Sequence, residues 1–248
     1  MELRRFMILI AAALSACAAV ARADDAAPFA KANSDYAAGR FDDAVRGYDE
    51  VVRAGNWSAT LFYDLANAYF RAGNSGKAIL NYERALALEA KHPEAAANLR
   101  LARERVRALE LRSGNADRYL RSATSAQYAV TAAAAFWIAA FAGASLFFRR
   151  RRTAVGPLVL VCGIAVCGLT AYAAWALETG NNGRALAIVT AKDIQARLAT
   201  ADNSGAVLAL PPGSEVKVLS TRGDWIYAAL PNDLRGWIPA TAAELVRM

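Results

Sequence analysis

Residues 147–166 read FFRRRRTAVGPLVLVCGIAV and place four consecutive arginines between two long apolar runs. The four are Arg149, Arg150, Arg151 and Arg152. Residues 128–148 on one side and 154–177 on the other contain no charged side chain. A helix needs about 20 apolar residues to cross the hydrocarbon core of a bilayer. The pattern therefore predicts two transmembrane helices over these runs, joined by a tight, arginine-rich turn at residues 149–153.

A hairpin buried inside a soluble protein is the alternative for these two runs. Neither run has a polar face, and the remainder of the chain is too small to surround both helices. Short loops rich in arginine stay in the cytoplasm, so we expect both ends of the hairpin to face outward. Ala139 and Gly143 form a small-xxx-small step that favours close approach of the two helices.

One group of charges opposes this orientation. Four arginines lie within about 20 residues of the first predicted span, on its supposed outer side. They are Arg107, Arg112, Arg118 and Arg121. The N-terminal segment decides between the two orientations in favour of an outward-facing pair of ends.

The first 23 residues have the pattern of an export signal. A basic MELRR is followed by the apolar FMILIAAALSACAAV and by ARA, which predicts a signal peptide over residues 1–23, cleaved after Ala23. Two alternatives stay open: the run from Leu14 to Cys17 resembles a bacterial lipobox, and the segment could also remain as an uncleaved anchor. All three interpretations place the residues that follow outside the cytoplasm.

The charge of the chain is unevenly distributed. The net charge is +7 over 248 residues, of which 56% are hydrophobic, yet residues 24–99 hold 8 basic and 11 acidic side chains. The basic excess lies in residues 100–121 and at Arg149 to Arg152, beside the apolar runs. Charge in that position orients a protein in a bilayer, so we expect no nucleic-acid partner.

The three cysteines do not form a disulfide framework. Cys17 lies in the leader, and Cys162 and Cys167 are five residues apart in an apolar run. In a helix their Cα atoms would be about 8 Å apart, which is beyond disulfide reach. We expect them to fill space in an apolar helix.

The segment before the spans repeats itself. Similar residues recur at an offset of 34 positions, which is the period of an antiparallel helix pair. The pairs are Phe29 and Tyr63, Asn33 and Asn67, Tyr36 and Phe70, Gly39 and Gly73, Ala44 and Ala78, and Tyr48 and Tyr82. On these residues, the segment resembles the tetratricopeptide repeat family, and we assign residues 24–122 to such a domain. A helix from Pro93 is expected to cap the last repeat.

The resemblance implies a short α-solenoid whose first helices line a concave surface. That surface would present aromatic and amide side chains to an extended protein partner. The expected binding residues are Phe29, Asn33, Tyr36, Tyr63, Asn67 and Phe70. The alternative is structural: the amides would join adjacent helices and the rings would belong to the core. Some family members hold a C-terminal carboxylate with lysine and asparagine, but Phe29 and Asp64 occupy those positions here.

Short β-type runs follow the second span. ALAIVTA, AVLAL, EVKVLS, WIYAAL and GWIPA alternate with turn sequences, which predicts five strands and a small barrel over residues 184–248. The order of a P-G-S-x-V-x-V strand from Pro212, a G-D-W strand from Gly223 and a final G-W-I strand from Gly236 resembles bacterial Src-homology-3 (SH3) domains. The segment DIQARLAT departs from the family pattern in the first loop.

The SH3-like resemblance implies a module that binds peptides or cell-wall material. Trp225 and Trp237 are the candidate binding residues in this part. We expect at least one of the two to belong to the barrel core instead.

No catalytic motif is visible in the sequence. His92 is the only histidine, and it precedes Pro93 at a repeat boundary, where a role at the helix junction is expected. Phosphate-binding glycine motifs and C-x-x-C pairs are absent from the sequence. We expect neither enzymatic activity nor a metal or other cofactor.

The predicted fold class is thus multi-domain, with an α-solenoid, a two-helix transmembrane hairpin and a small all-β barrel. This order resembles the BatE-like proteins of bacterial aerotolerance (Bat) operons. The resemblance implies partners with von Willebrand A domains and a MoxR-type ATPase at the inner membrane. A peptidoglycan-binding envelope anchor is the alternative. In both cases the N- and C-terminal domains are expected in the periplasm.

Overall fold

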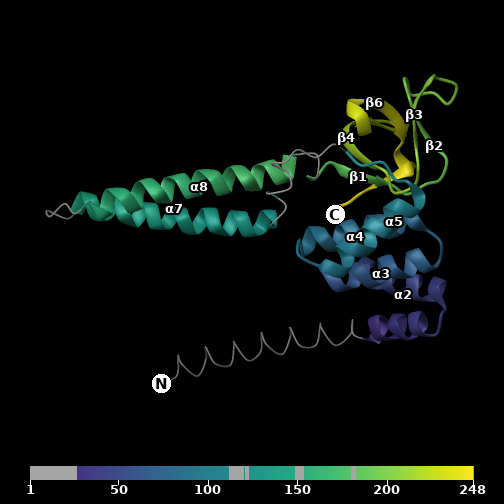
Figure 1. Cartoon of the computed structure of the whole chain (residues 1–248), viewed down its shortest axis with the longest axis horizontal. Helices are drawn as coiled ribbons and strands as arrows, with labels where there is room; N and C mark the ends of the chain where they lie inside the picture. The colour runs from purple at the N-terminus through teal and green to yellow at the C-terminus, as the bar shows by residue number, and fades with distance from the viewer. Residues whose placement is uncertain (1–26, 112–119, 121–122, 149–153, 180–182, 248) are drawn as a thin grey trace.

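The computed structural model describes residues 27–111, 120, 123–148, 154–179 and 183–247 (Figure 1). Two predicted segments lie outside these residues. They are the signal peptide at residues 1–23 and the cytoplasmic turn with Arg149, Arg150, Arg151 and Arg152. The described part contains a group of helices, a long helical hairpin and an antiparallel sheet. The predicted mixture of helical and β architecture is therefore confirmed at this level.

In the described part of the chain, five helices precede the hairpin. Residues 27–37 are helical. The others are α2 (Phe41–Arg53), α3 (Ala59–Arg71), α4 (Ser75–Leu88) and α5 (Pro93–Val106). The first residues of α2 and α4 are 34 positions apart, as are those of α3 and α5. The sequence offset therefore corresponds to a real alternation of helices.

Local capping explains where these helices begin and end. The Ser58 hydroxyl accepts a hydrogen bond from the Leu61 amide (3.1 Å), and the Asn74 side chain accepts one from the Lys77 amide (3.2 Å). Gly39 and Gly73 follow helices with φ values of +76° and +83°, which a side chain would strain. These residues set the positions of the sharp turns between antiparallel helices.

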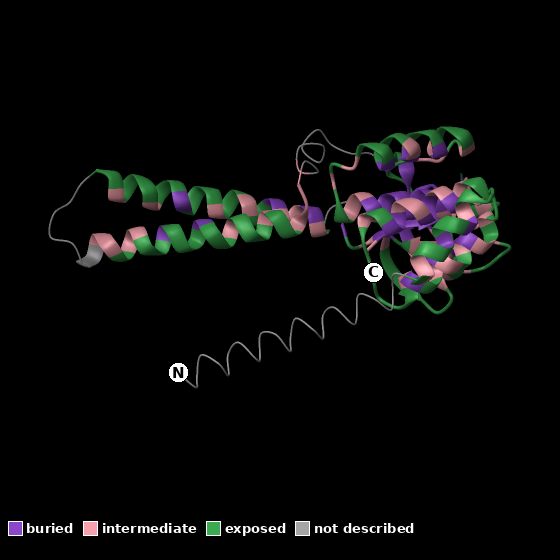
Figure 2. Cartoon of the chain, turned by 90° about the horizontal axis from the view of Figure 1, so that it is seen from below, coloured by how far each residue is buried: buried purple, intermediate pink, exposed green. Residues whose placement is uncertain are grey.

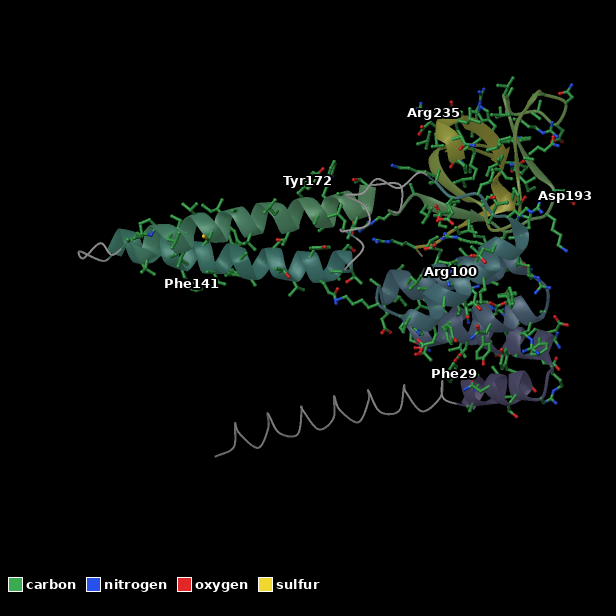
Figure 3. The ribbon with its side chains drawn as sticks, in the orientation of Figure 1. Phe29, Arg100, Phe141, Tyr172, Asp193 and Arg235 are labelled. Atoms are coloured by element: carbon green, nitrogen blue, oxygen red, sulfur yellow. The ribbon has the colours of Figure 1, made fainter. Side chains whose placement is uncertain are left out.

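The hairpin consists of α7 (Ser125–Phe148) and α8 (Val155–Thr179). Both helices are long and apolar enough to cross a membrane. Most of their surface is exposed (Figure 2), and Phe141 and Tyr172 point away from the hairpin (Figure 3). A soluble core helix would bury such side chains, so this exposure favours a lipid environment.

The two hairpin helices meet at small residues. A Cβ atom added to Gly163 would lie 2.9 Å from the Cβ of Ala139. Ala139 therefore lies at the close approach, as predicted, but its partner is Gly163 on the other helix. At Gly143 an added Cβ would make only an ordinary contact, 3.6 Å from Leu160. Cys162 and Cys167 are free thiols, as predicted.

The C-terminal part is a seven-stranded antiparallel sheet with the order β3-β2-β6-β5-β4-β1-β7. The strands are β1 (Leu186–Val189), β2 (Ile194–Arg197), β3 (Ala206–Leu210), β4 (Glu215–Arg222), β5 (Trp225–Ala229), β6 (Arg235–Pro239) and β7 (Ala243–Leu245). The five predicted strands correspond to β1 and β3 to β6. Two strands were missed: β2 lies in the segment that we interpreted as a loop, and β7 follows the last predicted strand. The hydrogen-bonded order is open, with β3 and β7 at its edges, rather than closed.

Strand β1 joins the sheet to the helices. All four of its residues are buried. Leu186 and Ile188 pack into the core of the helical part, whereas Ala187 and Val189 pack into the core of the sheet. An added Cβ on Gly76 of α4 would lie 2.8 Å from the Thr190 carbonyl oxygen, so helix and strand touch closely. The helical part and the sheet therefore form one body with a shared strand.

Ion pairs also connect the helical part to the sheet. The Arg103 guanidinium of α5 contacts Glu83 of α4 at 2.6 Å, Glu215 of β4, and Glu110 at 3.5 Å. Burial alone lowers the pKa of Arg103, but the surrounding carboxylates outweigh it and raise the pKa above its ordinary value. On α4, Lys77 pairs with Glu244 of β7 at 3.3 Å.

The shared core constrains the hairpin. The helical part precedes α7 and the sheet follows α8, yet they pack together in one body. Both open ends of the hairpin lie next to this body (Figure 1). The start of α7 and the end of α8 therefore both lie on the side of the hairpin that faces this body.

Candidate functional site

The helical part contains equivalent contacts in two helix pairs that lie 34 positions apart. The Tyr48 hydroxyl donates a hydrogen bond to the Asn33 side-chain oxygen at 2.6 Å, and the Tyr82 hydroxyl donates to Asn67 at 2.6 Å. All four residues belong to the pairs found 34 positions apart in the sequence. The asparagines therefore do join adjacent helices, as the structural interpretation expected.

These contacts leave part of each asparagine available. Within the described residues, no hydrogen bond uses the Nδ2 donor of Asn33 or Asn67. Asn33 is exposed and Asn67 is half-buried. Each amide can therefore hold its tyrosine through oxygen and still donate to a ligand through nitrogen. The structural and the binding interpretations are compatible.

The aromatic residues also pack in equivalent pairs. The ring centroids of Phe29 and Tyr48 are 5.7 Å apart, and those of Tyr63 and Tyr82 are 6.2 Å apart. The predicted aromatic residues of the groove are partly buried against the helical core. They thus support the core with one face and contribute surface with the other.

A pocket of about 180 Å³ opens beside the second repeat. It is lined by Tyr36, Asn67, Phe70, Arg71, Tyr82, Asn98 and Leu101. Three predicted residues, Tyr36, Asn67 and Phe70, are brought together here. We define the groove as this pocket together with Phe29, Asn33 and Tyr63 on the neighbouring turns of the same helices.

Sequence reasoning missed the contribution of α5 to the groove. The Asn98 side chain donates to the Asn67 oxygen at 3.1 Å, and Leu101 lines the pocket with an exposed side chain. Leu101 lies 34 positions after Asn67, so the offset points to the turn of α5 that lines the pocket. It does not predict that a leucine replaces the asparagine there.

Two guanidinium groups lie at the rim of the groove. Arg71 is 4.5 Å from the centroid of the Phe41 ring, and Arg105 is 5.2 Å from that of Phe70. Stacking on a ring holds a guanidinium in place without using all of its hydrogen-bond donors. The rim of the pocket is therefore positively charged.

A negatively charged side chain, Asp64, lies on α3 near His92. Asp64 of α3 is half-buried, and burial raises its pKa, an effect that nearby His92 partly offsets. His92 itself caps α5: its Nδ1 accepts a hydrogen bond from the Ala95 amide at 3.3 Å, and its ring lies 4.9 Å from Tyr63. The predicted role of His92 at a helix junction is confirmed.

The two candidate tryptophans lie on the sheet and not in the groove. Trp225 and Tyr227 of β5 share one face of the strand, and Trp237 of β6 pairs with Tyr227 at a ring distance of 5.0 Å. The buried residues Ile226 and Ile238 occupy the other face. Neither tryptophan belongs to the sheet core, so the expectation that at least one would do so was wrong. The alternation along each strand places them on the outer face.

Comparison with known proteins adds no assignment. No protein-family model and no curated protein matches the chain. Among the described residues, no group of three or more His, Cys, Asp and Glu side chains is arranged to hold a metal ion. The chemical character of the site is thus defined by amides, aromatic rings and arginines.

Proposed function

We propose that this chain is a non-enzymatic adaptor, anchored in the bacterial inner membrane by α7 and α8. It presents two tetratricopeptide repeats and an SH3-like domain on the periplasmic side. The observation that carries the proposal is the groove: two equivalent Tyr–Asn pairs leave amide donors available beside half-buried rings. Such a surface suits the backbone and side chains of an extended protein segment.

The groove favours a partner segment with an acidic residue. Arg71 and Arg105 stand at its rim, and a carboxylate makes the strongest hydrogen bonds with a guanidinium. The Nδ2 donors of Asn33 and Asn67 would bond the backbone carbonyls of the bound segment. By its resemblance to BatE-like proteins, the partner would be a membrane protein with a von Willebrand A domain, in a complex with a MoxR-type ATPase.

Photo-crosslinking in living cells tests this proposal. A photoreactive amino acid replaces Leu101 in the groove, and a matched one replaces Leu198, an exposed leucine after β2. We expect position 101 alone to capture a protein with a von Willebrand A domain, and Arg71→Glu to reduce the adduct. Equal capture at both positions, or an adduct that Arg71→Glu leaves unchanged, contradicts the proposal.

The outer face of the sheet supports a second candidate function. Trp225, Tyr227 and Trp237 form a half-exposed aromatic surface, and aromatic faces pack well against the apolar faces of sugar rings. A peptidoglycan anchor would use this surface. Sedimentation of the purified chain with cell-wall sacculi tests this function. Co-sedimentation that Trp237→Ala abolishes supports a peptidoglycan anchor, and absence of co-sedimentation contradicts it.

A further inference from the structure

One edge of the helical part combines two turns. The turn at residues 54–58 connects α2 to α3, and the turn at residues 89–92 connects α4 to α5. Because successive helices run antiparallel, the ends that these turns connect lie at the same end of the helix stack. We call this edge, with its two turns and the last residue of α4, the loop edge.

The loop edge faces the hairpin (Figure 1). A pocket of about 180 Å³ lies between Leu86 and Ala90 on one side and Ser125 and Leu177 at the ends of the hairpin on the other. The Arg247 side chain donates a hydrogen bond to the Ser125 hydroxyl at 3.4 Å. The ends of the spans, and with them the surface of any bilayer that they cross, therefore adjoin the loop edge.

Large apolar side chains are exposed on this edge. Within residues 27–111, the exposed ones are Trp57, Leu88 and Leu101. Leu101 lines the groove, whereas Trp57 and Leu88 lie on the loop edge with exposed fractions of 49% and 48%. Two exposed apolar side chains on an edge that adjoins membrane spans are suited to contact with lipid.

Trp57 is prepared for such an interface. Its indole N–H donates a hydrogen bond to the Val52 carbonyl oxygen at 3.0 Å, which ties the ring to the end of α2. The polar atom is therefore satisfied inside the protein, and the ring can enter an apolar medium without losing a hydrogen bond to water. Tryptophan is also enriched at the level of lipid headgroups in membrane proteins.

We infer that the loop edge rests on the bilayer, with Trp57 and Leu88 inserted into the outer interfacial layer. The inference depends on the proposal that α7 and α8 span the membrane. Within the loop edge, the charge of Lys91 is balanced by that of Glu89, so the contact is apolar and does not require anionic lipid. The body is then held at the spans and at the loop edge.

Fluorescence of single cysteines tests this contact in the full chain. The native cysteines are replaced by alanine, and an environment-sensitive probe is attached at position 57 or 88 in phosphatidylcholine vesicles. Leu198→Cys on the sheet provides the aqueous reference. Cys162, retained alone, provides the membrane reference, because it is exposed on the surface of α8.

We expect probes at positions 57 and 88 to be quenched by nitroxide-labelled lipid and shielded several-fold from iodide. The probe at position 198 should show the reverse, and added anionic lipid or salt should leave the pattern unchanged. If Cys162 is shielded while positions 57 and 88 behave like position 198, the loop edge does not touch the membrane. Exposure of Cys162 itself to iodide overturns the span proposal and this inference together.

Discussion

Replacement of Arg103 by methionine should destabilise the junction between the helices and the sheet. The Arg103 side chain is 13% exposed, and its partners Glu83 and Glu215 are 8% and 3% exposed. Methionine fills a similar volume, so the change removes the charge without opening a large cavity. The two buried carboxylates would then lose the cation that they share.

The magnitude follows from this arrangement. Removing one partner of a buried ion pair costs about 3–5 kcal/mol. For a domain of this size, each kcal/mol lowers the melting temperature by about 2–4 °C, so Arg103→Met should lower it by about 6–20 °C.

The control lies on the same helix. Arg100 of α5 is 77% exposed and pairs only loosely with Glu104, at 3.9 Å. Its replacement by methionine should change the unfolding free energy by less than about 1 kcal/mol. Thermal unfolding of both variants in detergent, followed by circular dichroism, compares them directly. Equal melting temperatures for Arg103→Met and Arg100→Met would refute the reasoning.

Three further changes probe the groove and the hairpin. Asp64→Asn should stabilise the protein at neutral pH, because the half-buried carboxylate has a raised pKa and its charged form costs free energy; unfolding measured against pH should show the advantage vanish in acid. Tyr82→Phe removes the hydrogen bond to Asn67 and should cost about 1 kcal/mol in chemical denaturation, whereas an unchanged midpoint argues against that bond. Gly163→Leu should separate the hairpin helices at Ala139 and lower the yield of a disulfide engineered between them; an unaltered yield contradicts the packing.

The helices and the hairpin could be predicted because their signals are local. The 34-residue offset makes Asn67 equivalent to Asn33 and Tyr82 equivalent to Tyr48, and the uncharged runs identify α7 and α8 within a few residues. The offset reflects the length of one helix pair, and the uncharged runs reflect the thickness of a bilayer, so both can be read from the sequence without knowledge of tertiary contacts.

The missed features depend on contacts between distant residues. Arg103 and Glu215 are 112 positions apart, and the residues around each of them contain no pattern that predicts the ion pair. The β1 sequence reads as a buried strand, but its packing against α4 is a tertiary property. The expectation that at least one tryptophan lies in the core was wrong because a large aromatic residue in a short strand suits the core and the outer face equally well.

Both soluble parts share one core, so both lie on one side of any membrane that α7 and α8 cross, and we propose that this side is the periplasm. Labelling with a membrane-impermeant maleimide in whole spheroplasts tests the claim most directly, with single cysteines at Leu101, Leu198 and Arg151 in a chain without native cysteines. We expect positions 101 and 198 to react from outside, and position 151 to react only after the membrane is permeabilised. Reaction at position 151 alone in intact spheroplasts, or at only one of the other two, would contradict it.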